Sequence, residues 1–253
     1  MPVPLASVSA DLPQTPAFEP LKPQTLVDRV IDAVIASAAR GAILPGDRIV
    51  ESEVARGLGI SRVPVREALR LLESQGIVVS EPYKGIRLRP VTNAWVHDLV
   101  EARAALETRA AHRAIEAGLN TGPPIAPMRA AVAEMELMAA RGDAYGIAAS
   151  DTAFHRALCR LGGNAVILDL WETLARQVTI VFGLASLRKP MPEIVAEHRD
   201  LLEVFEAGDP DAVAAILDEH ITVMNHAVDY EALVAARRHA VAGRRGLAAT
   251  EPA

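Results

Sequence analysis

Apolar residues recur at helical spacing along most of this chain, and this pattern constrains the fold more than any other feature. Past residue 92 the chain indicates six helices separated by Gly or Pro breaks, with almost no branched or aromatic residues at period two. The expected helices are 93–118, 124–141, 143–161, 164–186, 192–207 and 210–240. Hydrophobic residues make up 51% of the chain, enough for real cores. The sequence therefore predicts a mainly α protein with an all-α six-helix bundle.

The segment before residue 92 predicts a smaller unit made of three short helices and a hairpin. The first helix starts at Leu26, the second covers about 52–57, and the third begins after Ser61. Ser61 can cap the free amides of this third helix, and Pro64 falls in its first turn, where a missing N–H costs little. The stretches 77–80 and 86–89 flank a basic turn, which is typical of a two-stranded hairpin.

The two ends of the chain lack a regular pattern. Residues 1–25 contain six prolines and predict a flexible arm, and we expect a frayed, flexible tail at 237–253. The folded parts are then 26–91 and 92–236. The N-terminus lacks the basic start and apolar stretch of a secretory signal, and no run approaches the ~18 apolar residues of a membrane span. These absences favour a cytoplasmic location without membrane contact, and the single cysteine, Cys159, suits a reducing compartment.

The net charge of −6 argues at first sight against a nucleic-acid partner, because phosphate binding depends on Lys and Arg. The average hides an asymmetry. Residues 26–90 carry ten Arg or Lys against eight Asp or Glu, so this segment is positive and the remainder holds the negative charge. Such asymmetry indicates a nucleic-acid-binding head on a body with another role.

The third helix has the pattern of a recognition helix. Val65, Ala68, Leu69 and Leu72 share one apolar face, which leaves the N-terminal end free to enter the major groove of DNA. The hairpin would act as a wing, with Arg87 and Arg89 near its basic tip. The expected DNA-contacting residues are Ser52, Ser61, Arg62, Val63, Arg66, Lys84 and Gly85. The alternative is an ordinary amphipathic helix with solvated arginines, but the order of helices and hairpin favours the DNA-binding interpretation.

Four residues of the helical body are candidate metal ligands. Asp151 and His155 lie four residues apart and share one helix face, while His198 and His220 stand equally far from Asp209 in a Gly-Asp-Pro turn. If the helices on either side of this turn are antiparallel, the two imidazoles lie level with one another. Three histidines and one aspartate suit Zn²⁺ best, with Ni²⁺, Mn²⁺ or Fe²⁺ as alternatives.

Several alternatives to this metal site remain open. Each histidine could be a hydrogen-bonded core residue, and a metal bound by four protein groups could simply brace the bundle. A metal with open positions could accept a small organic acid instead. A metal-dependent hydrolase using the same cluster is a further hypothesis, although no obvious general base such as His-Glu-x-x-His is present. A nucleoid-type architectural protein would leave the large acidic body unexplained.

Residues 41–89 resemble the winged helix-turn-helix of the GntR family of bacterial transcription regulators. The family hallmark Ser-Arg-x-Pro-Val-Arg-Glu-Ala-Leu stands here at 61–69, with Val63 where many members carry Thr. A hydroxyl contact is therefore missing at this position, and a methyl contact to thymine becomes available. The resemblance implies a sequence-specific DNA-binding regulator, and a homodimer suits the small DNA area that one head contacts.

The helical body is similar to the FCD domain of the FadR-type branch of this family. Metal-binding members carry an Asp-x-x-x-His pair and two later histidines, which match Asp151, His155, His198 and His220. The resemblance implies that a small carboxylate effector binds this cavity and modulates operator affinity, most simply in a repressor that is not an enzyme. The candidate effector-binding residues are Arg103, Asn164 and Asn225.

Overall fold

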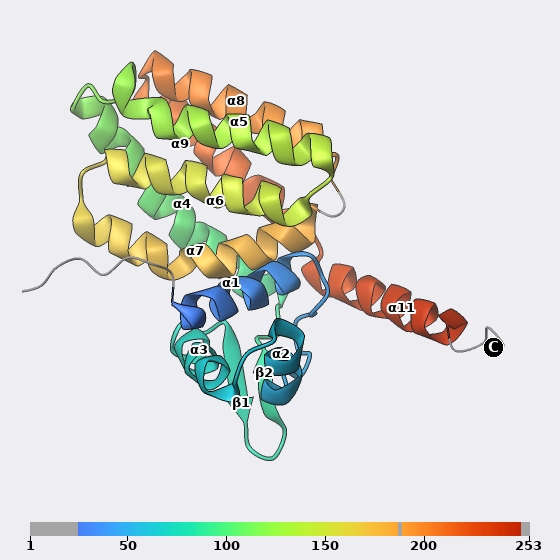
Figure 1. Cartoon of the computed structure of the whole chain (residues 1–253). Helices are drawn as coiled ribbons and strands as arrows, with labels where there is room; N and C mark the ends of the chain where they lie inside the picture. Colours follow the sequence, from blue (N-terminus) through green and yellow to red (C-terminus); the bar gives the residue numbers. More distant parts are fainter. Residues whose placement is uncertain (1–24, 187–188, 249–253) are drawn as a thin grey trace, which may run out of the picture.

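The computed structural model describes residues 25–186 and 189–248, with 241–248 as backbone only. Figure 1 shows a helical body with a small head beneath it and one helix, α11, that projects from the body. The expected arm at 1–24 lies outside the described residues. No helix in the described part of the chain is long and apolar enough to span a membrane.

The head contains three helices and a two-stranded antiparallel sheet. In chain order these are α1 (Leu26–Ala39), α2 (Glu51–Leu58), α3 (Arg62–Ser74), β1 (Val78–Glu81) and β2 (Gly85–Leu88). Thr25 caps α1 through a reciprocal bond pair with Asp28. Ser61 occupies the cap position of α3, but its side chain makes no capping bond among the described residues, contrary to our expectation. The architecture nevertheless confirms the predicted winged helix-turn-helix.

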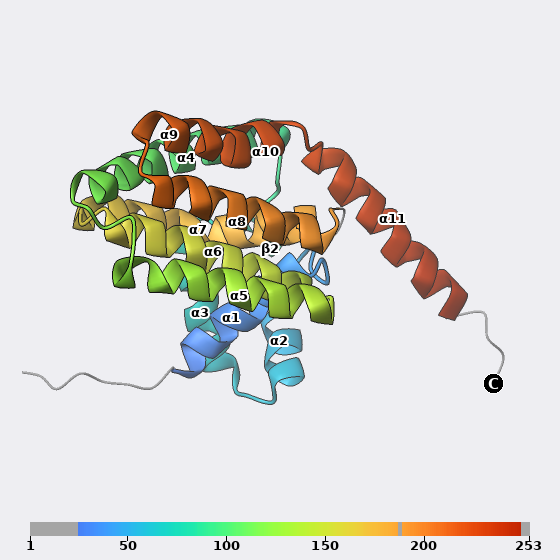
Figure 2. The same cartoon turned by 90° about the horizontal axis from the view of Figure 1, so that it is seen from above.

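The body is a bundle in which helices distant in sequence lie side by side. Its elements are α4 (Asn93–Glu116), a 3-10 turn (Pro123–Ile125), α5 (Ala126–Arg141), α6 (Ala144–Leu161), α7 (Ala165–Ser186), α8 (Met191–Ala207) and α9 (Pro210–Asp218). Figure 2 shows α4, α9 and the short α10 (Met224–His226) forming one layer above α6, α7 and α8. The predicted helices of the bundle agree with these elements as far as α8.

The sixth predicted helix, 210–240, is wrong as a continuous helix. After α9 the backbone forms a π turn (Glu219–Val223), a short helix α10 (Met224–His226) and a break, and then α11 (Tyr230–Ala248). Asp229 stabilises the first turn of α11 because its carboxylate accepts a hydrogen bond from the amide of Ala232. The flexible tail expected at 237–253 is also corrected as far as Ala248, since its Ala- and Arg-rich sequence has high helix propensity.

Head and body share one apolar core. Buried side chains of α1 and α3, such as Ile31 and Leu69, belong to the same contiguous cluster as Phe154 and Val181 of the body. Head and body approach closely at Gly183 of α7, which packs on Ala39 at the end of α1. A Cβ placed on Gly183 would lie 2.5 Å from the Cβ of Ala39 and 2.8 Å from its carbonyl oxygen. The two helices can approach this closely only because residue 183 lacks a side chain.

We expect Gly183→Ala to lower the free energy of unfolding by about 1–3 kcal/mol, because the added methyl forces α1 and α7 apart. Gly57→Ala is the matched control, since nothing lies within 4 Å of the added Cβ and the helix of Gly57 gains about 0.5–1 kcal/mol. Urea unfolding followed by circular dichroism measures both. Stabilisation by both substitutions would show that the head does not depend on this close contact.

Candidate functional sites

The N-terminal end of α3 presents an exposed basic surface of the head. The side chains of Arg62 and Arg66 are 60% and 51% exposed, and Val63 is 63% exposed. The opposite face of α3 is fully buried, as its apolar spacing predicted. Both arginines form ion pairs with Glu51, the first residue of α2. The helix therefore presents two positioned guanidinium groups to solvent.

The tip of the wing carries one cation and one aromatic ring. Lys84 is exposed and pairs with Glu81 at 2.8 Å. Tyr83, which the sequence analysis passed over, is fully exposed and holds a left-handed backbone with φ of 63°. Gly85 also has positive φ, and a side chain there would crowd the guanidinium of Arg48. Ser52 is exposed in the first turn of α2, next to Glu51.

Arg87 and Arg89 do not extend the basic tip. Nη1 of Arg87 donates to the carbonyl of Gly46 at 2.8 Å, and Nε of Arg89 donates to the carbonyl of Gly76 at 2.6 Å. Both guanidinium groups satisfy backbone carbonyls at turns, so they tie the hairpin to the head. Sequence alone could not separate these arginines from the exposed ones, because strand alternation sets only the face of each side chain.

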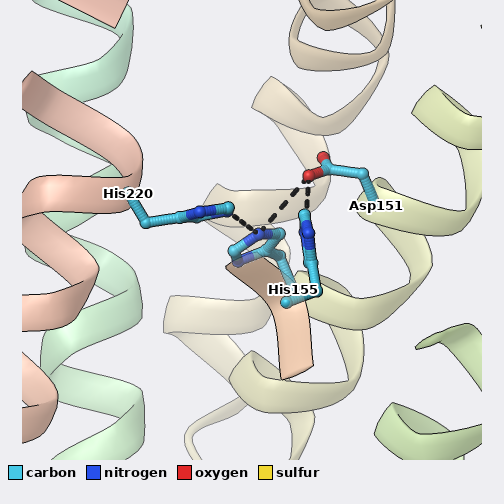
Figure 3. A group of neighbouring side chains, drawn as sticks. Asp151, His155 and His220 are labelled. Carbon is cyan, nitrogen blue, oxygen red and sulfur yellow. Dashed lines mark hydrogen bonds and ion pairs between the residues drawn. The ribbon is translucent and has the colours of Figure 1, made fainter. Parts of the chain in front are cut away.

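The body brings Asp151, His155, His198 and His220 together. One ligand atom from each lies within 4.8 Å of the others, and all four side chains are buried. Figure 3 shows Asp151 and His155 on one helix, with His220 reaching toward them from another. Oδ1 of Asp151 lies 2.9 Å from Nε2 of His198 and 3.6 Å from Nε2 of His155. The equal spacing of His198 and His220 about the turn thus corresponds to a real convergence.

Hydrogen bonds determine which nitrogen of two histidines is free. Nδ1 of His198 donates to the carbonyl of Ile194 at 2.8 Å, so in the neutral ring the lone pair of Nε2 faces Asp151. Nδ1 of His155 donates to Glu107 at 2.6 Å, and its Nε2 lies 3.3 Å from Nε2 of His220. Lone pairs that face one another or a carboxylate repel unless a proton or a metal ion lies between them.

Glu107 is a site residue that the sequence analysis did not single out. Its carboxylate accepts hydrogen bonds from Arg103, His155 and the indole of Trp171, at 2.6–2.7 Å. Burial alone would raise the pKa of Glu107, but the charges of Arg103 and His155 outweigh it and hold the pKa at about 2. Arg103 and Glu107 lie one helical turn apart in α4, and this spacing is the sequence signal that could have paired them.

The same electrostatics set the protonation of the cluster. Burial would raise the pKa of Asp151, but the neighbouring His155 and His198 keep it well below its usual range. Burial and the nearby His198 and His155 lower the pKa of His220 well below its usual range. Asp151 is therefore ionised and His220 neutral at neutral pH, which are the forms that bind metal ions.

Three buried polar atoms have no hydrogen-bond partner in the part of the chain that the structure describes. They are Nη2 of Arg103, Oδ2 of Asp151 and Nδ1 of His220. Unsatisfied buried polar atoms are costly, and their concentration at one point indicates a place for an additional polar group.

A cavity of about 90 Å³ reaches this cluster from the C-terminal end of α7. Its walls include Phe182, Lys189, Glu197, His220 and Asn225, and Lys189 and Glu197 form an ion pair with one another. Asn225 is buried and accepts a hydrogen bond from the hydroxyl of Tyr230 at 2.5 Å. Of the three expected effector-binding residues, only Asn225 lines this cavity.

Asn164 lies elsewhere than we expected, whereas Arg103 lies beside the candidate metal ligands and its contact with an effector stays a prediction. Arg103 lies on the cluster itself, with 1% of its side chain exposed, and its Nε donates to Glu107 instead of entering the cavity. Asn164 immediately precedes α7, and its side-chain oxygen accepts hydrogen bonds from the amides of Val166 and Ile167. Asn164 is therefore a helix cap, a role that asparagine at the start of a helix often has.

Comparisons with known proteins identify two matching regions. The model of the bacterial regulatory proteins, gntR family, matches residues 26–88, and the FCD domain model matches residues 98–223. A probable D-xylose utilization operon transcriptional repressor of Paenarthrobacter nicotinovorans is 32% identical over 197 residues, which cover 78% of this chain and 86% of that protein. The transcriptional repressor RspR of Escherichia coli is 25% identical over 187 residues, 74% of this chain and 81% of RspR.

Among solved structures, Escherichia coli McbR/YncC superposes with a TM-score of 0.67 at 22% identity, over 82% of this chain and 98% of that one. At this sequence identity the likeness supports the fold alone. The fold agrees with the one predicted from the sequence. Both relatives carry names that describe repressors, and none of these matches supports the hydrolase hypothesis.

Proposed function

The chain belongs to the gntR family of bacterial regulatory proteins and carries an FCD domain, and we propose that it is a repressor whose operator affinity responds to a small carboxylate bound beside a metal ion. Regulators of this family bind DNA operators and function as dimers. The observation that carries the proposal is the convergence of four buried ligand groups beneath a cavity, in the same molecule as an exposed arginine-bearing recognition helix.

The head supplies the DNA-reading part of the proposal. The exposed end of α3 enters the major groove, where Arg62 and Arg66 bond guanine and Val63 contacts a thymine methyl group. Ser52, Ser61 and the backbone at Gly85 contact phosphates, while Lys84 reaches the flanking backbone. A homodimer places two such heads on two half-sites, which one small head needs for high specificity.

The donor set of the body fits a divalent transition metal. Nε2 of His198 and Nε2 of His155 point their lone pairs at groups that also carry negative charge or lone pairs, and a cation removes this repulsion. Three imidazole nitrogens and one carboxylate oxygen suit Zn²⁺, and also Ni²⁺, Mn²⁺ or Fe²⁺. When bound, the ion supplies a positive centre with a position open to an acidic ligand.

The charge of the buried cluster favours an anionic effector. Arg103 contributes one positive charge, and Glu107 and Asp151 contribute two negative charges. Metal binding requires neutral imidazoles, so a bound divalent ion changes the summed charge of Arg103, Glu107 and Asp151 from minus one to plus one, which a single carboxylate neutralises. The role of Arg103 in this proposal is to hold Glu107 and Asp151 ionised, while Asn225 on the cavity wall contacts the effector.

Two helices connect the cavity to the head. Phe182 of α7 lines the cavity, and one to two turns earlier Arg176 and Gln177 donate hydrogen bonds to Gln75 at the end of α3, at 2.6 and 2.8 Å. Helix α11 begins at Tyr230, which bonds Asn225, and its Arg238 binds Asp47 of the head at 2.6 Å. An effector that favours one placement of these helices therefore changes operator affinity, and DNA changes effector affinity by the same factor.

We expect the purified protein to carry about one divalent transition-metal ion per chain and His198→Ala to lose it, because one of four ligands is removed. Elemental analysis by mass spectrometry measures the content. His112→Ala is the control, since His112 bonds the carbonyl of Pro210 away from the cluster. An unchanged metal content in His198→Ala would remove His198 from the ligand set.

We expect Arg66→Ala to weaken binding to the operator by about 1–3 kcal/mol and to relax the preference at one base pair. Lys84→Ala should weaken binding to all sequences alike and lower the salt slope by about one. Fluorescence anisotropy with duplexes from the chain's own upstream region measures both, and Arg129→Ala on α5 is the remote control. Wild-type affinity in both head variants would contradict the docking.

Small carboxylates should weaken operator binding of the metal-loaded protein by about 5–150-fold and leave the chelator-treated protein unaffected. Asn225→Ala should remove this response, whereas Asn164→Ser, which keeps the helix cap, should retain it. A screen of carboxylates in the same anisotropy assay measures the response. Equal release of the operator with and without metal would show that the effector acts independently of the metal site.

A further inference from the structure

Glu51 holds both arginines of the recognition helix. Nη2 of Arg62 donates to Oε2 of Glu51 at 3.0 Å. Arg66 makes a two-point contact, with Nη2 on Oε2 at 3.2 Å and Nε on Oε1 at 3.3 Å. The Glu51 side chain is 20% exposed, so it is more enclosed than either arginine that it binds. One carboxylate thus joins two guanidinium groups at the tip of α3.

This contact restricts how each guanidinium can meet DNA. In Arg66 the Nε–Nη2 edge is occupied, which leaves the terminal Nη1–Nη2 end for a base. In Arg62 only Nη2 is engaged. Recognition of guanine requires two N–H groups held parallel in one plane, and a carboxylate that fixes the plane reduces the entropy lost on binding.

Glu51 also limits contacts with phosphates. Two arginines without an acidic partner carry two positive charges and repel one another, so they swing toward the phosphates of any sequence. With Glu51 the group carries one net positive charge. The hydrogen bonds from Arg66 and Arg62 keep the pKa of Glu51 below its usual value, so the carboxylate stays ionised.

We propose that Glu51 is a positioning residue that sets operator specificity, by aligning Arg62 and Arg66 for base contacts and by reducing their attraction to non-operator DNA. The proposal rests on the proposed function, because it requires that these arginines contact DNA. Ion pairs between exposed groups contribute little to folding, so removal of the Glu51 charge should leave the fold intact.

The test is Glu51→Gln in the full-length chain, with Kd measured by fluorescence anisotropy for the operator and for a scrambled duplex of equal length. We expect several-fold tighter binding to the scrambled duplex and a specificity ratio about tenfold lower. The salt dependence of non-operator binding should become steeper by about one unit, the effect of roughly one more phosphate contact. Circular dichroism checks the fold.

Glu53→Gln is the matched control. Glu53 lies in the same first turn of α2 and is exposed, and no arginine contacts it among the described residues. This variant removes the same charge but keeps the contacts between Glu51 and the two arginines. We therefore expect its specificity ratio to stay at the wild-type value. An equal loss of specificity in Glu51→Gln and Glu53→Gln would assign the effect to overall charge and overturn the proposal.

Repeating Glu51→Gln in an Arg62→Ala, Arg66→Ala background separates the remaining outcomes. If Glu51 acts through the arginines, its substitution should no longer change the specificity ratio there. A persisting change would show that Glu51 contacts DNA itself. An unchanged specificity ratio in Glu51→Gln, together with loss of operator binding in Arg66→Ala, would overturn the positioning role of Glu51. The proposed function would then still stand. Wild-type operator binding in all of these variants would refute the docking itself.

Discussion

The buried network of Arg103, Glu107, Asp151 and the three histidines is the constraint on which the body depends. An isolated buried charge costs several kcal/mol, so each carboxylate must meet a cation or a hydrogen-bond donor. Helices α4, α6 and α7 all contribute to the bonds around Glu107, and α8 and the π turn bring the remaining imidazoles. The relative placement of these helices is therefore set by polar bonds as well as by apolar packing.

The same helices reach the head, which gives the network influence beyond the body. Trp171 in the first half of α7 donates a hydrogen bond to Glu107, and Gln177, less than two turns later, donates one to the end of α3. A continuous apolar core and the close contact between Gly183 and Ala39 leave little room for independent movement. A change at the buried Asp–His cluster that shifts α7 must therefore shift the recognition helix or break this contact.

Local patterns predicted much of this structure, and long-range contacts account for the rest. The buried face of α3, the wing and the helices through α8 follow from periodicity and Gly or Pro breaks, and the turn at Asp209 predicted that His198 and His220 converge. Glu107 was missed because one acidic residue on a helix looks like any solvated one until its neighbours are known. The π turn around His220 and the inward bonds of Arg87 and Arg89 likewise depend on partners far away in sequence.

An acidic protein that reads DNA appears contradictory only if affinity is the sole requirement. Non-operator sites greatly outnumber operators, so the ratio of specific to non-specific binding determines occupancy. A negative body reduces attraction to DNA in general, while a few cations at the tip of α3 and of the wing remain to read one site. Glu51 has the same effect at close range. It lowers the net positive charge at the tip of α3, where phosphates compete with bases, and leaves Arg62 and Arg66 with the N–H groups that a guanine needs.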